Sequence, residues 1–248
     1  MGNVFINGDG DIVANSFAQI STNCLGCKNI PAYIISMTNT EYDNAFKRLS
    51  KFGLNNIKKF NAIRGDSLDN FVKNQKNVTI KGLYNIKLQN IRGAHAELTN
   101  INSIGCYLSH VALWKKIIKD NLPGMIIFES DCICSGDILN CLDAFLKVKN
   151  GHLLYFGYFG SKIEYVDIIT KINTRTYGLH AYYITNECAK ILLKNAFPIE
   201  QQLDSYISDM LLLSQDINSI IPPLNFYVCR NLCGQYMHTS YLQTKIVG

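Results

Sequence analysis

The sequence has no uninterrupted apolar run that approaches the roughly 18 residues of a membrane-spanning helix. Its first residues also lack the basic start and the following apolar stretch of a secretory signal peptide. Lys and Arg are scattered, and the basic stripe with interleaved aromatic residues that is typical of nucleic-acid binding is missing. We therefore expect no membrane span, no nucleic-acid partner and a cytoplasmic location.

Charge is also sparse, because only 17% of the 248 residues are charged whereas 48% are hydrophobic, and the net charge is +5. Such a chain can bury a substantial core, and its length suits one large α/β domain or two small ones. A weakly basic surface suits a phosphate-bearing substrate but does not require one. The composition, rich in Asn, Ile and Lys, is typical of an AT-rich genome, and a viral protein of this kind would lie in the host cytoplasm.

The nine cysteines are an odd number in a sequence with no evident signal peptide. We therefore interpret most of them as reduced, small buried residues of a reducing compartment. Cys24 and Cys27 form a single CxxC motif. A zinc site would need a second pair, for which Cys132/Cys134 and Cys229/Cys233 are candidates without further support.

The chain divides into an irregular start and one domain. Residues 1–28 are rich in Gly, Asn and Asp and show no periodicity, so we expect an irregular N-terminal segment before a single domain over residues 29–248. Residues 66–100 lack a pattern and are predicted to form an insertion or a mobile loop. Elsewhere strands alternate with helices, which favours an α/β fold with a mostly parallel central sheet and helices on both faces. The predicted strands cover residues 32–36, 57–63, 124–128, 152–156, 163–169, 178–184 and 219–228. The predicted helices cover residues 39–52, 103–120, 137–149, 186–195 and 204–213.

Two acidic residues follow the apolar strand at 124–128, namely Glu129 and Asp131, with Ser130 between them. Residues two apart at the end of a strand point to the same side, so the two carboxylates could hold one divalent cation. In open α/β sheets, ligands gather beyond the carboxyl ends of the strands. The pair therefore predicts a site for Mn²⁺ or Mg²⁺ that in turn binds phosphate groups.

Four segments together resemble the family 25 glycosyltransferases, which include lipooligosaccharide and collagen galactosyltransferases. The most specific segment is Ile104–Trp114, which matches the Gly-Cys…Ser-His…Trp helix of the family. Residues 32–65 match its opening strand, helix and A-x-x-G turn, and Ile126–Asp131 matches its acidic metal motif. Residues 178–206 match its G-x-x-a-Y-x-I-S block and its D-x-Y segment. The resemblance spans residues 30–240.

The resemblance implies a GT-A-like fold, a nucleotide-sugar donor that is typically a UDP-sugar, Mn²⁺ or a similar ion, and an inverting reaction. The sequence departs from the family at two places. Glu41-Tyr42-Asp43 stands where the family has an arginine early in its first helix, and Ser130 replaces the middle acid of the metal motif. Either departure could change the donor or leave the chain inactive.

Several residues are candidates for contacts with the donor. Ser36 and Arg64 follow predicted strands, where nucleotides bind. Ser109 and His110 match the family motif and would line the donor pocket. The structural alternative is that Ser109 bonds back to the preceding helical turn and that His110 is satisfied within the core. Ser130 stands where the missing acid of the family would contact the metal or the sugar.

The catalytic base and a third metal ligand are also hypotheses that depend on the resemblance. Asp204 matches the Asp of the D-x-Y segment and would take the proton of the acceptor hydroxyl, with Asp209 as the fallback. The alternative for Asp204 is a helix N-cap. His238 would complete the metal site, and its alternative is a surface histidine.

We therefore predict a metal-dependent, inverting glycosyltransferase that moves a hexose, galactose or glucose, from a UDP-sugar to a hydroxyl group of a glycan or protein. Two other classes remain open. A catalytically silent sugar-nucleotide-binding relative would explain Ser130 and the missing arginine. A metal-dependent nucleotidyltransferase would also use a pair of acids at a strand end.

Overall fold

The computed structural model describes residues 25–65, 75–88, 94–98, 100–160, 162–230 and 232–235. Most of the predicted irregular N-terminal segment lies outside these residues, and its last four residues form the short helix α1 (Leu25–Lys28). None of the described helices is long and apolar enough to cross a membrane.

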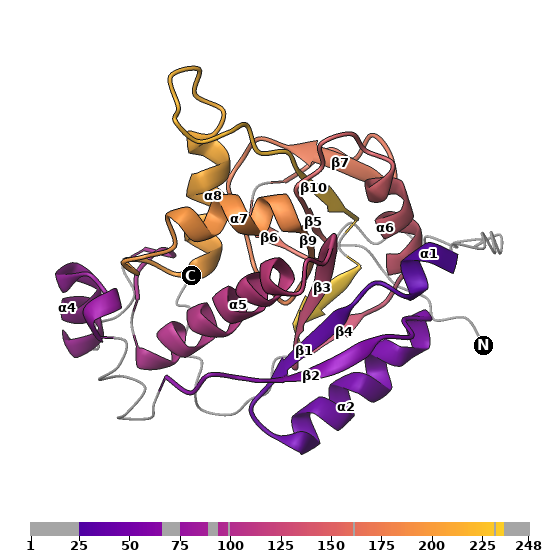
Figure 1. Ribbon diagram of the computed structural model, residues 1–248, viewed down its shortest axis with the longest axis horizontal. Coiled ribbons are helices and arrows are strands. Elements are labelled where there is room, and N and C mark those ends of the chain that lie inside the picture. The colour runs from indigo at the N-terminus through magenta and orange to yellow at the C-terminus, as the bar shows by residue number, and fades with distance from the viewer. Residues whose placement is uncertain are drawn as a thin grey trace, which may run out of the picture.

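A seven-stranded sheet forms the centre of the molecule, with its strands in the order β2-β1-β3-β9-β5-β10-β7 (Figure 1). Five of these strands run in one direction, and β9 and β7 run in the opposite direction. The predicted α/β class with a mostly parallel sheet is therefore confirmed, with two antiparallel strands. The strands are β1 (Ala32–Ser36), β2 (Ile57–Asn61), β3 (Gly124–Glu129), β5 (Leu153–Tyr155), β7 (Ile169–Ile172), β9 (Ala181–Thr185) and β10 (Phe226–Cys229).

Helices cover both faces of this sheet, as predicted (Figure 1). Successive side chains of a strand point to opposite faces, so β1 sends Ile35 into one apolar core and Ile34 into another. In the same way β3 supplies Ile127 to the first core and Phe128 to the second. The first core is covered by α5 (Ile101–Lys119), α7 (Asn186–Lys194) and α8 (Leu203–Leu213), and the second by α2 (Asn39–Leu49) and α6 (Ile138–Leu146).

Local capping sets the ends of these helices. The side chain of Thr38 accepts a hydrogen bond from the N–H of Glu41 and begins α2. A short turn of 3-10 helix (Ser50–Phe52) continues it, and Gly53, at φ 79°, ends it in the left-handed region that glycine tolerates. Helix α5 begins two residues before the predicted Ser103, because the side chain of Asn100 accepts the N–H of Ser103.

Several predicted boundaries are wrong. The region at 66–100, predicted to lack structure, contains a 3-10 turn (Gln75–Asn77) and helix α4 (Ile80–Leu88). The strand predicted at 163–169 is absent from the described residues there, since only Ile169 belongs to a strand. Two small antiparallel sheets were not predicted. They pair β4 (Cys132–Cys134) with β11 (Cys233–Gln235), and β6 (Phe159–Gly160) with β8 (Thr176–Tyr177).

Candidate functional site

The candidate site lies at the carboxyl end of β3, where the chain turns into β4. Glu129 ends β3 and pairs with Ile35 of β1. Its N–H donates to the carbonyl of His180 at 2.9 Å, and the N–H of Ser130 donates to the carbonyl of Ile35 at 3.0 Å. Backbone bonds to neighbouring segments on both sides therefore fix the position from which the acidic side chains project.

Both carboxylate oxygens of Glu129 have partners. Oε1 lies 3.3 Å from Nε2 of His110 and 3.6 Å from the thiol of Cys106, and Oε2 accepts from Nε2 of Gln235 at 3.0 Å. Burial alone would raise the pKa of Glu129, but the interactions with His110, with smaller contributions from His180 and Gln235, lower it overall. Glu129 is therefore held ionised and in one orientation.

A buried chain of donors leads from α5 and β9 to this carboxylate. Nε1 of Trp114 donates to the hydroxyl of Tyr182 at 3.1 Å, and that hydroxyl lies 3.0 Å from Nδ1 of His110. All three side chains are buried. Since the Tyr182 oxygen already accepts from Trp114, its own proton is best placed toward Nδ1, which leaves the imidazole proton on Nε2 to donate to Glu129. His110 thus orients Glu129 from within the core.

Asp131 contrasts with Glu129. Its Oδ1 is buried and has no hydrogen-bond partner among the described residues. Burial, followed by repulsion from Glu129, raises the pKa of Asp131 to about 7, and Arg48 of α2 offsets only part of this rise. A buried carboxylate oxygen without a donor is costly, and a bound cation would remove both the desolvation and the repulsion. The two acids therefore fit a divalent cation such as Mn²⁺ or Mg²⁺.

Arg48 supplies a positive charge near these acids although the early arginine of the family is missing. Its Nη2 donates to the carbonyl of Ser130 at 2.6 Å, and its Nε donates to the carbonyl of Cys132 at 3.4 Å. These bonds hold the turn that carries Asp131 against α2. A contact between Ser130 and a donor stays a prediction.

Ser36 and Arg64 lie where the sequence placed them, at the carboxyl ends of β1 and β2. The hydroxyl of Ser36 is buried without a hydrogen-bond partner in the described part of the chain. Arg64 and Lys115 are the charged residues that line a cavity of about 410 Å³ between the turn after β2 and helix α5. An orphaned hydroxyl and two cations suit a phosphorylated ligand, but their contact with a nucleotide stays a prediction. The other lining residues are Ala62, Ile63, Leu108, Val111 and Ala112.

The contacts of Ser109 agree with the structural alternative, and a contact between Ser109 and the donor stays a prediction. It is fully buried, and its hydroxyl donates to the carbonyl of Gly105 at 2.7 Å. The same oxygen accepts from the N–H of Ile63 at 2.8 Å. The hydroxyl is therefore used in tying α5 to the segment after β2, and no atom of it faces solvent.

Asp204 is the second residue of α8, so it is not the N-cap, a position that Gln202 occupies. Oδ2 lies 2.9 Å from Nε2 of His95 and accepts from the N–H of Gly178 at 3.1 Å, while Oδ1 accepts from the N–H of Ser205 at 2.8 Å. Although burial acts against it, these donors lower the pKa of Asp204.

Asp204 and Glu129 both affect the ionisation of Cys106. Both carboxylates raise the pKa of the Cys106 thiol, after the larger effect of desolvation. The fallback base Asp209 is engaged elsewhere, because Oδ1 forms an ion pair with Arg175 at 2.7 Å and Oδ2 accepts from Gln201 at 3.0 Å. The role of either residue as the base stays a prediction. The predicted metal ligand His238 lies outside the described residues.

Sequence reasoning missed Cys106 and Gln235 at this site. Cys106 and His110 are four apart on one helix, which places them on the same face, so their joint approach to Glu129 could have been found. Their ligand atoms and that of Glu129 all lie within 4.8 Å of one another. Gln235 is more than a hundred residues away in sequence, and no local pattern relates it to Glu129.

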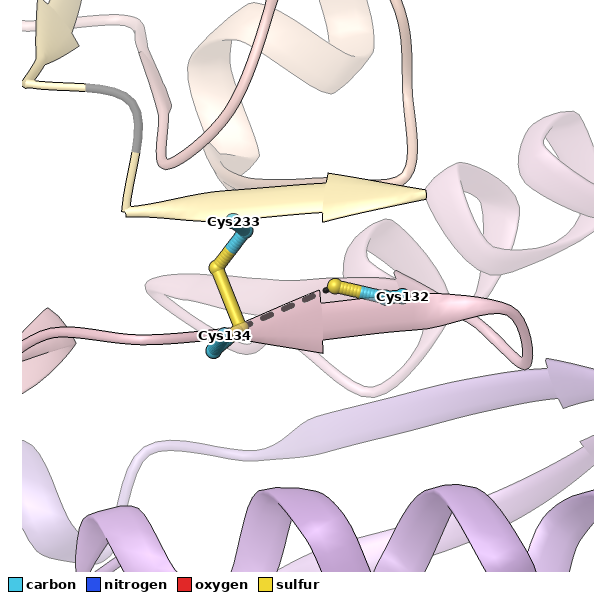
Figure 2. Close-up of side chains that lie close together, drawn as sticks. All are labelled: Cys132, Cys134 and Cys233. Carbon is cyan, nitrogen blue, oxygen red and sulfur yellow. Dashed lines mark hydrogen bonds between the residues drawn. A yellow bond between two sulfur atoms is a disulfide. The ribbon is translucent and has the colours of Figure 1, made fainter. Parts of the chain in front are cut away.

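The cysteines are only partly as predicted. Cys134 and Cys233 form a disulfide, with the thiol of Cys132 3.6 Å from Cys134 (Figure 2). Cys27 is also disulfide-bonded. The expectation that most of the cysteines are reduced agrees with the free cysteines of the described part, and these three are the exceptions. The free cysteines of the described part are Cys106, Cys132, Cys141, Cys188 and Cys229.

The comparison with protein families supports the resemblance. The family described as "Glycosyltransferase family 25 (LPS biosynthesis protein)" matches residues 29–167, which is more than half of the chain. A curated protein of Haemophilus influenzae named "Putative glycosyltransferase" is 28% identical over 196 residues. These residues make up 74% of this chain and 64% of that protein, so the chain spans less than two thirds of the length of this relative.

The solved structures named here share little sequence with this chain and have low TM-scores. The crystal structure of A197 from STIV covers 85% of this chain and 86% of its own, with a TM-score of 0.42 and 9% identity. The crystal structure of mouse xyloside xylosyltransferase 1 in its apo form covers 81% of this chain and 84% of its own chain. Its TM-score is 0.37 and its sequence identity is 10%. The family match includes the first strands, helix α5 and the acidic end of β3. The chain belongs to glycosyltransferase family 25.

Proposed function

We propose that this chain is a glycosyltransferase that moves a hexose, galactose or glucose, from a UDP-sugar to a hydroxyl group of a glycan or protein. The donor would bind at the carboxyl edge of β1, β2 and β3 in a GT-A-like manner. Mn²⁺ or Mg²⁺ would be held by Glu129 and Asp131, and the reaction would invert the configuration of the sugar. Membership of the family supports the reaction class, and the site supports the finer assignment.

The observation that carries this proposal is the unequal acid pair at the end of β3. Glu129 is held ionised by three neighbouring side chains, whereas Asp131 has a buried oxygen without a donor. A structural acid pair would be expected to share a lysine or arginine at hydrogen-bond distance. Arg48 instead donates hydrogen bonds to the main-chain carbonyls of Ser130 and Cys132. The pair is therefore suited to a cation and, through it, to a diphosphate.

The residues present indicate how such a reaction would be assisted. A bound divalent ion neutralises the charge that develops on the departing diphosphate. Glu129 and Asp131 would hold this ion, and the rigid chain from Trp114 through His110 would keep Glu129 in place before the donor arrives. Arg64 and Lys115, beside the cavity, would attract an anionic donor.

Asp204 would take the proton of the acceptor hydroxyl. Its carboxylate is mostly buried and accepts hydrogen bonds from two main-chain N–H groups. It also lies beside His95, whose side chain is 41% exposed. Its lowered pKa keeps it ionised at neutral pH, which is the state that a base requires. The same low pKa makes it a weak base, so proton transfer would occur late, as the sugar bond forms.

A catalytically silent sugar-nucleotide-binding relative is the second candidate. Ser130 removes one acid, and the carboxylate of Glu41 in α2 accepts a hydrogen bond from the N–H of Met37 rather than providing the positive charge of the family. Such a relative would bind UDP with Mn²⁺ but release no product. A nucleotidyltransferase, the remaining alternative, would release pyrophosphate.

A panel of UDP-sugars separates these functions. The protein is incubated with each sugar, Mn²⁺ and simple hydroxyl acceptors, and released UDP and pyrophosphate are measured. The proposal expects UDP release that depends on Mn²⁺ and is fastest with UDP-galactose or UDP-glucose. Binding of UDP and Mn²⁺ by calorimetry without any release would favour the silent relative, and pyrophosphate would favour the nucleotidyltransferase.

A further inference from the structure

The strand β11 is tied to the candidate site by a covalent bond. It pairs only with β4 among the described strands, in a small antiparallel sheet where Cys233 lies opposite Cys134. The disulfide between these two residues joins positions 99 apart in sequence (Figure 2). Cys134 lies three residues after Asp131, so the bond anchors the C-terminal part of the domain directly beside the acid pair.

This strand delivers Gln235 to Glu129. Nε2 of Gln235 donates to Oε2 of Glu129 at 3.0 Å, while His110 and Cys106 contact Oε1 from helix α5. Glu129 is therefore oriented from two sides, by the core on one side and by β11 on the other. Partners of this kind around a metal-binding carboxylate typically contribute 10- to 100-fold to metal affinity.

Hydrogen bonds to Phe156 and His180 fix the beginning of β11. The N–H of Cys233 donates to the carbonyl of Phe156 at 3.0 Å, and the carbonyl of Cys233 accepts from Nε2 of His180 at 3.0 Å. Gln235, two residues further on, lies opposite Cys132 in the ladder. A slip of one residue in this register would turn Gln235 to the other face, and the disulfide prevents such a slip.

We propose that Gln235 is a positioning residue for Glu129 and that the Cys134–Cys233 disulfide makes this positioning dependent on redox state. The inference rests on the proposed function in one respect, that Glu129 binds the metal. In the reducing step, a small dithiol gives up two electrons and two protons and becomes a disulfide, while the Cys134–Cys233 bond becomes two thiols. The strand β11 is then held by its short ladder with β4 and by the hydrogen bonds of Cys233, without a covalent link, and Gln235 leaves Glu129.

The sulfur atom of Cys132 could form a disulfide with Cys134 in place of Cys233, and this alternative pairing can be tested. The Cys132 thiol is buried and lies 3.6 Å from Cys134 Sγ (Figure 2). A bond between Cys132 and Cys134 would lie within β4 and would leave β11 untied. Peptide mapping of the protein under non-reducing conditions is therefore the first test. A Cys134–Cys233 peptide is expected, and a Cys132–Cys134 peptide or three free thiols would overturn the inference.

Amide hydrogen exchange tests whether the disulfide holds β11 in place, without any measurement of activity. Exchange in the peptide that covers 226–235 is expected to become faster when the whole protein is treated with a dithiol, and in the Cys233→Ser variant. The Cys132→Ala variant is the matched control, since it keeps the disulfide, and its exchange should equal that of the wild type. Unchanged exchange after verified reduction would overturn the proposal, even if Cys233→Ser fails to fold.

A double-mutant comparison tests the coupling to Glu129. Mn²⁺ affinity is measured by electron paramagnetic resonance for the wild type and Gln235→Ala, each before and after reduction. Reduction is expected to weaken Mn²⁺ binding by the wild type about 10- to 100-fold and to have no further effect on Gln235→Ala. Equal losses in both proteins would contradict the role of Gln235. Absence of Mn²⁺ binding by the oxidised wild type would instead contradict the proposed function. Hydrogen exchange would still show whether the disulfide holds β11 in place.

Discussion

Asp131 and Glu129 are two apart in sequence but have opposite environments. Three side chains contact the carboxylate of Glu129, and none of the described residues donates a hydrogen bond to the buried oxygen of Asp131. The pKa of Asp131, raised to about 7, reflects burial and the nearby charge of Glu129. At neutral pH the ligand-free fold therefore carries an electrostatic cost at this position, which a cation would relieve.

Replacement of Asp131 separates function from stability. Asp131→Asn is expected to abolish Mn²⁺-dependent UDP release, because it removes half of the acid pair. The melting temperature of the metal-free protein should stay nearly unchanged or rise, since a repelled buried charge is lost. Turnover and thermal unfolding are the measurements. Asp120→Asn, which removes an exposed ion pair with Lys116, is the control and should turn over normally. Normal turnover by Asp131→Asn would count against the metal assignment.

His152 makes the stability of the fold depend on pH. It is buried, and its Nδ1 accepts from the N–H of Asn225 at 3.1 Å, which requires a ring without a proton on Nδ1. Burial lowers the pKa of His152 below its ordinary value of 6.5. Below that pH the unfolded chain therefore binds a proton that the folded chain does not, and stability falls as the pH decreases.

The His152→Asn variant tests this linkage, because an amide oxygen can accept the same hydrogen bond without titrating. Urea unfolding is measured at pH 7.5 and at pH 5.5 for both proteins. The wild type should lose more stability than the variant over this interval, by up to about 1.4 kcal/mol for each unit of pH through which only the unfolded histidine is protonated. Equal losses would show that His152 does not contribute.

At the residue scale, the sequence predicted those parts of the site that depend on local position. Glu129 and Asp131 lie where a strand end places them, Ser36 ends β1, and Arg64 lies just beyond the end of β2. The sequence could not decide between two roles for Ser109, because the partner that occupies its hydroxyl, the N–H of Ile63, comes from another element. Gln235 was unpredictable for the same reason, since only the folded chain brings it to Glu129.

Helix α5 approaches the turn after β2 very closely near the site. A Cβ on Gly105 would lie 2.4 Å from the carbonyl oxygen of Ile63, and one on Gly65 would lie 1.9 Å from the carbonyl oxygen of Ile101. Glycine is therefore required at both positions. This contact also positions Arg64 and the cavity beside Leu108.

A methyl group at this contact should be destabilising. Gly105→Ala would press against main-chain atoms that cannot rotate away, so a loss of about 1 to 3 kcal/mol in the free energy of unfolding is expected. Gly26→Ala is the matched control, because nothing lies within 4 Å of a Cβ at that helical position. Urea unfolding measures both variants. If Gly105→Ala is as stable as Gly26→Ala, the close approach of α5 to this turn is wrong.

At the scale of elements, strong periodic or apolar segments were predictable and weak ones were not. Strand β1, helix α7 and helix α8 agree with the sequence to within about two residues. Strand β7 begins where the predicted strand at 163–169 ends, because Ile163 and Tyr165 pack against the core from an irregular segment. Helix α4 was missed because its exposed side chains, such as Ile80 and Tyr84, follow no amphipathic pattern.

The whole molecule depends on contacts between distant parts of the chain. The disulfide between Cys134 and Cys233 spans 99 positions, and the sheet places β9 between β3 and β5. No local pattern encodes such neighbours, so the sequence predicted the class of the fold but neither the strand order nor the antiparallel direction of β9. It also predicted that most cysteines are reduced but not which of them pair, because cysteine spacing alone does not show which sulfur atoms meet.

The disulfide should contribute to global stability. In the chain-entropy model a bond that closes a loop of about 100 residues restricts the unfolded state by close to 4.7 kcal/mol, and typical values are 2 to 4 kcal/mol. Reduction of the wild type, or Cys233→Ser, is therefore expected to lower the melting temperature by several degrees, roughly 2 to 4 °C for each kcal/mol. Thermal unfolding with and without a dithiol measures this effect. A melting temperature that does not change on verified reduction would contradict it.

The most direct test of the central claim is a crystal structure of the protein soaked with Mn²⁺ and UDP, with anomalous scattering measured at the manganese edge. The account predicts an anomalous peak bound by carboxylate oxygens of both Glu129 and Asp131, with the diphosphate on its open side. A structure in which Asp131 instead forms an ion pair with Arg48, and the nucleotide is absent or bound elsewhere, would contradict it.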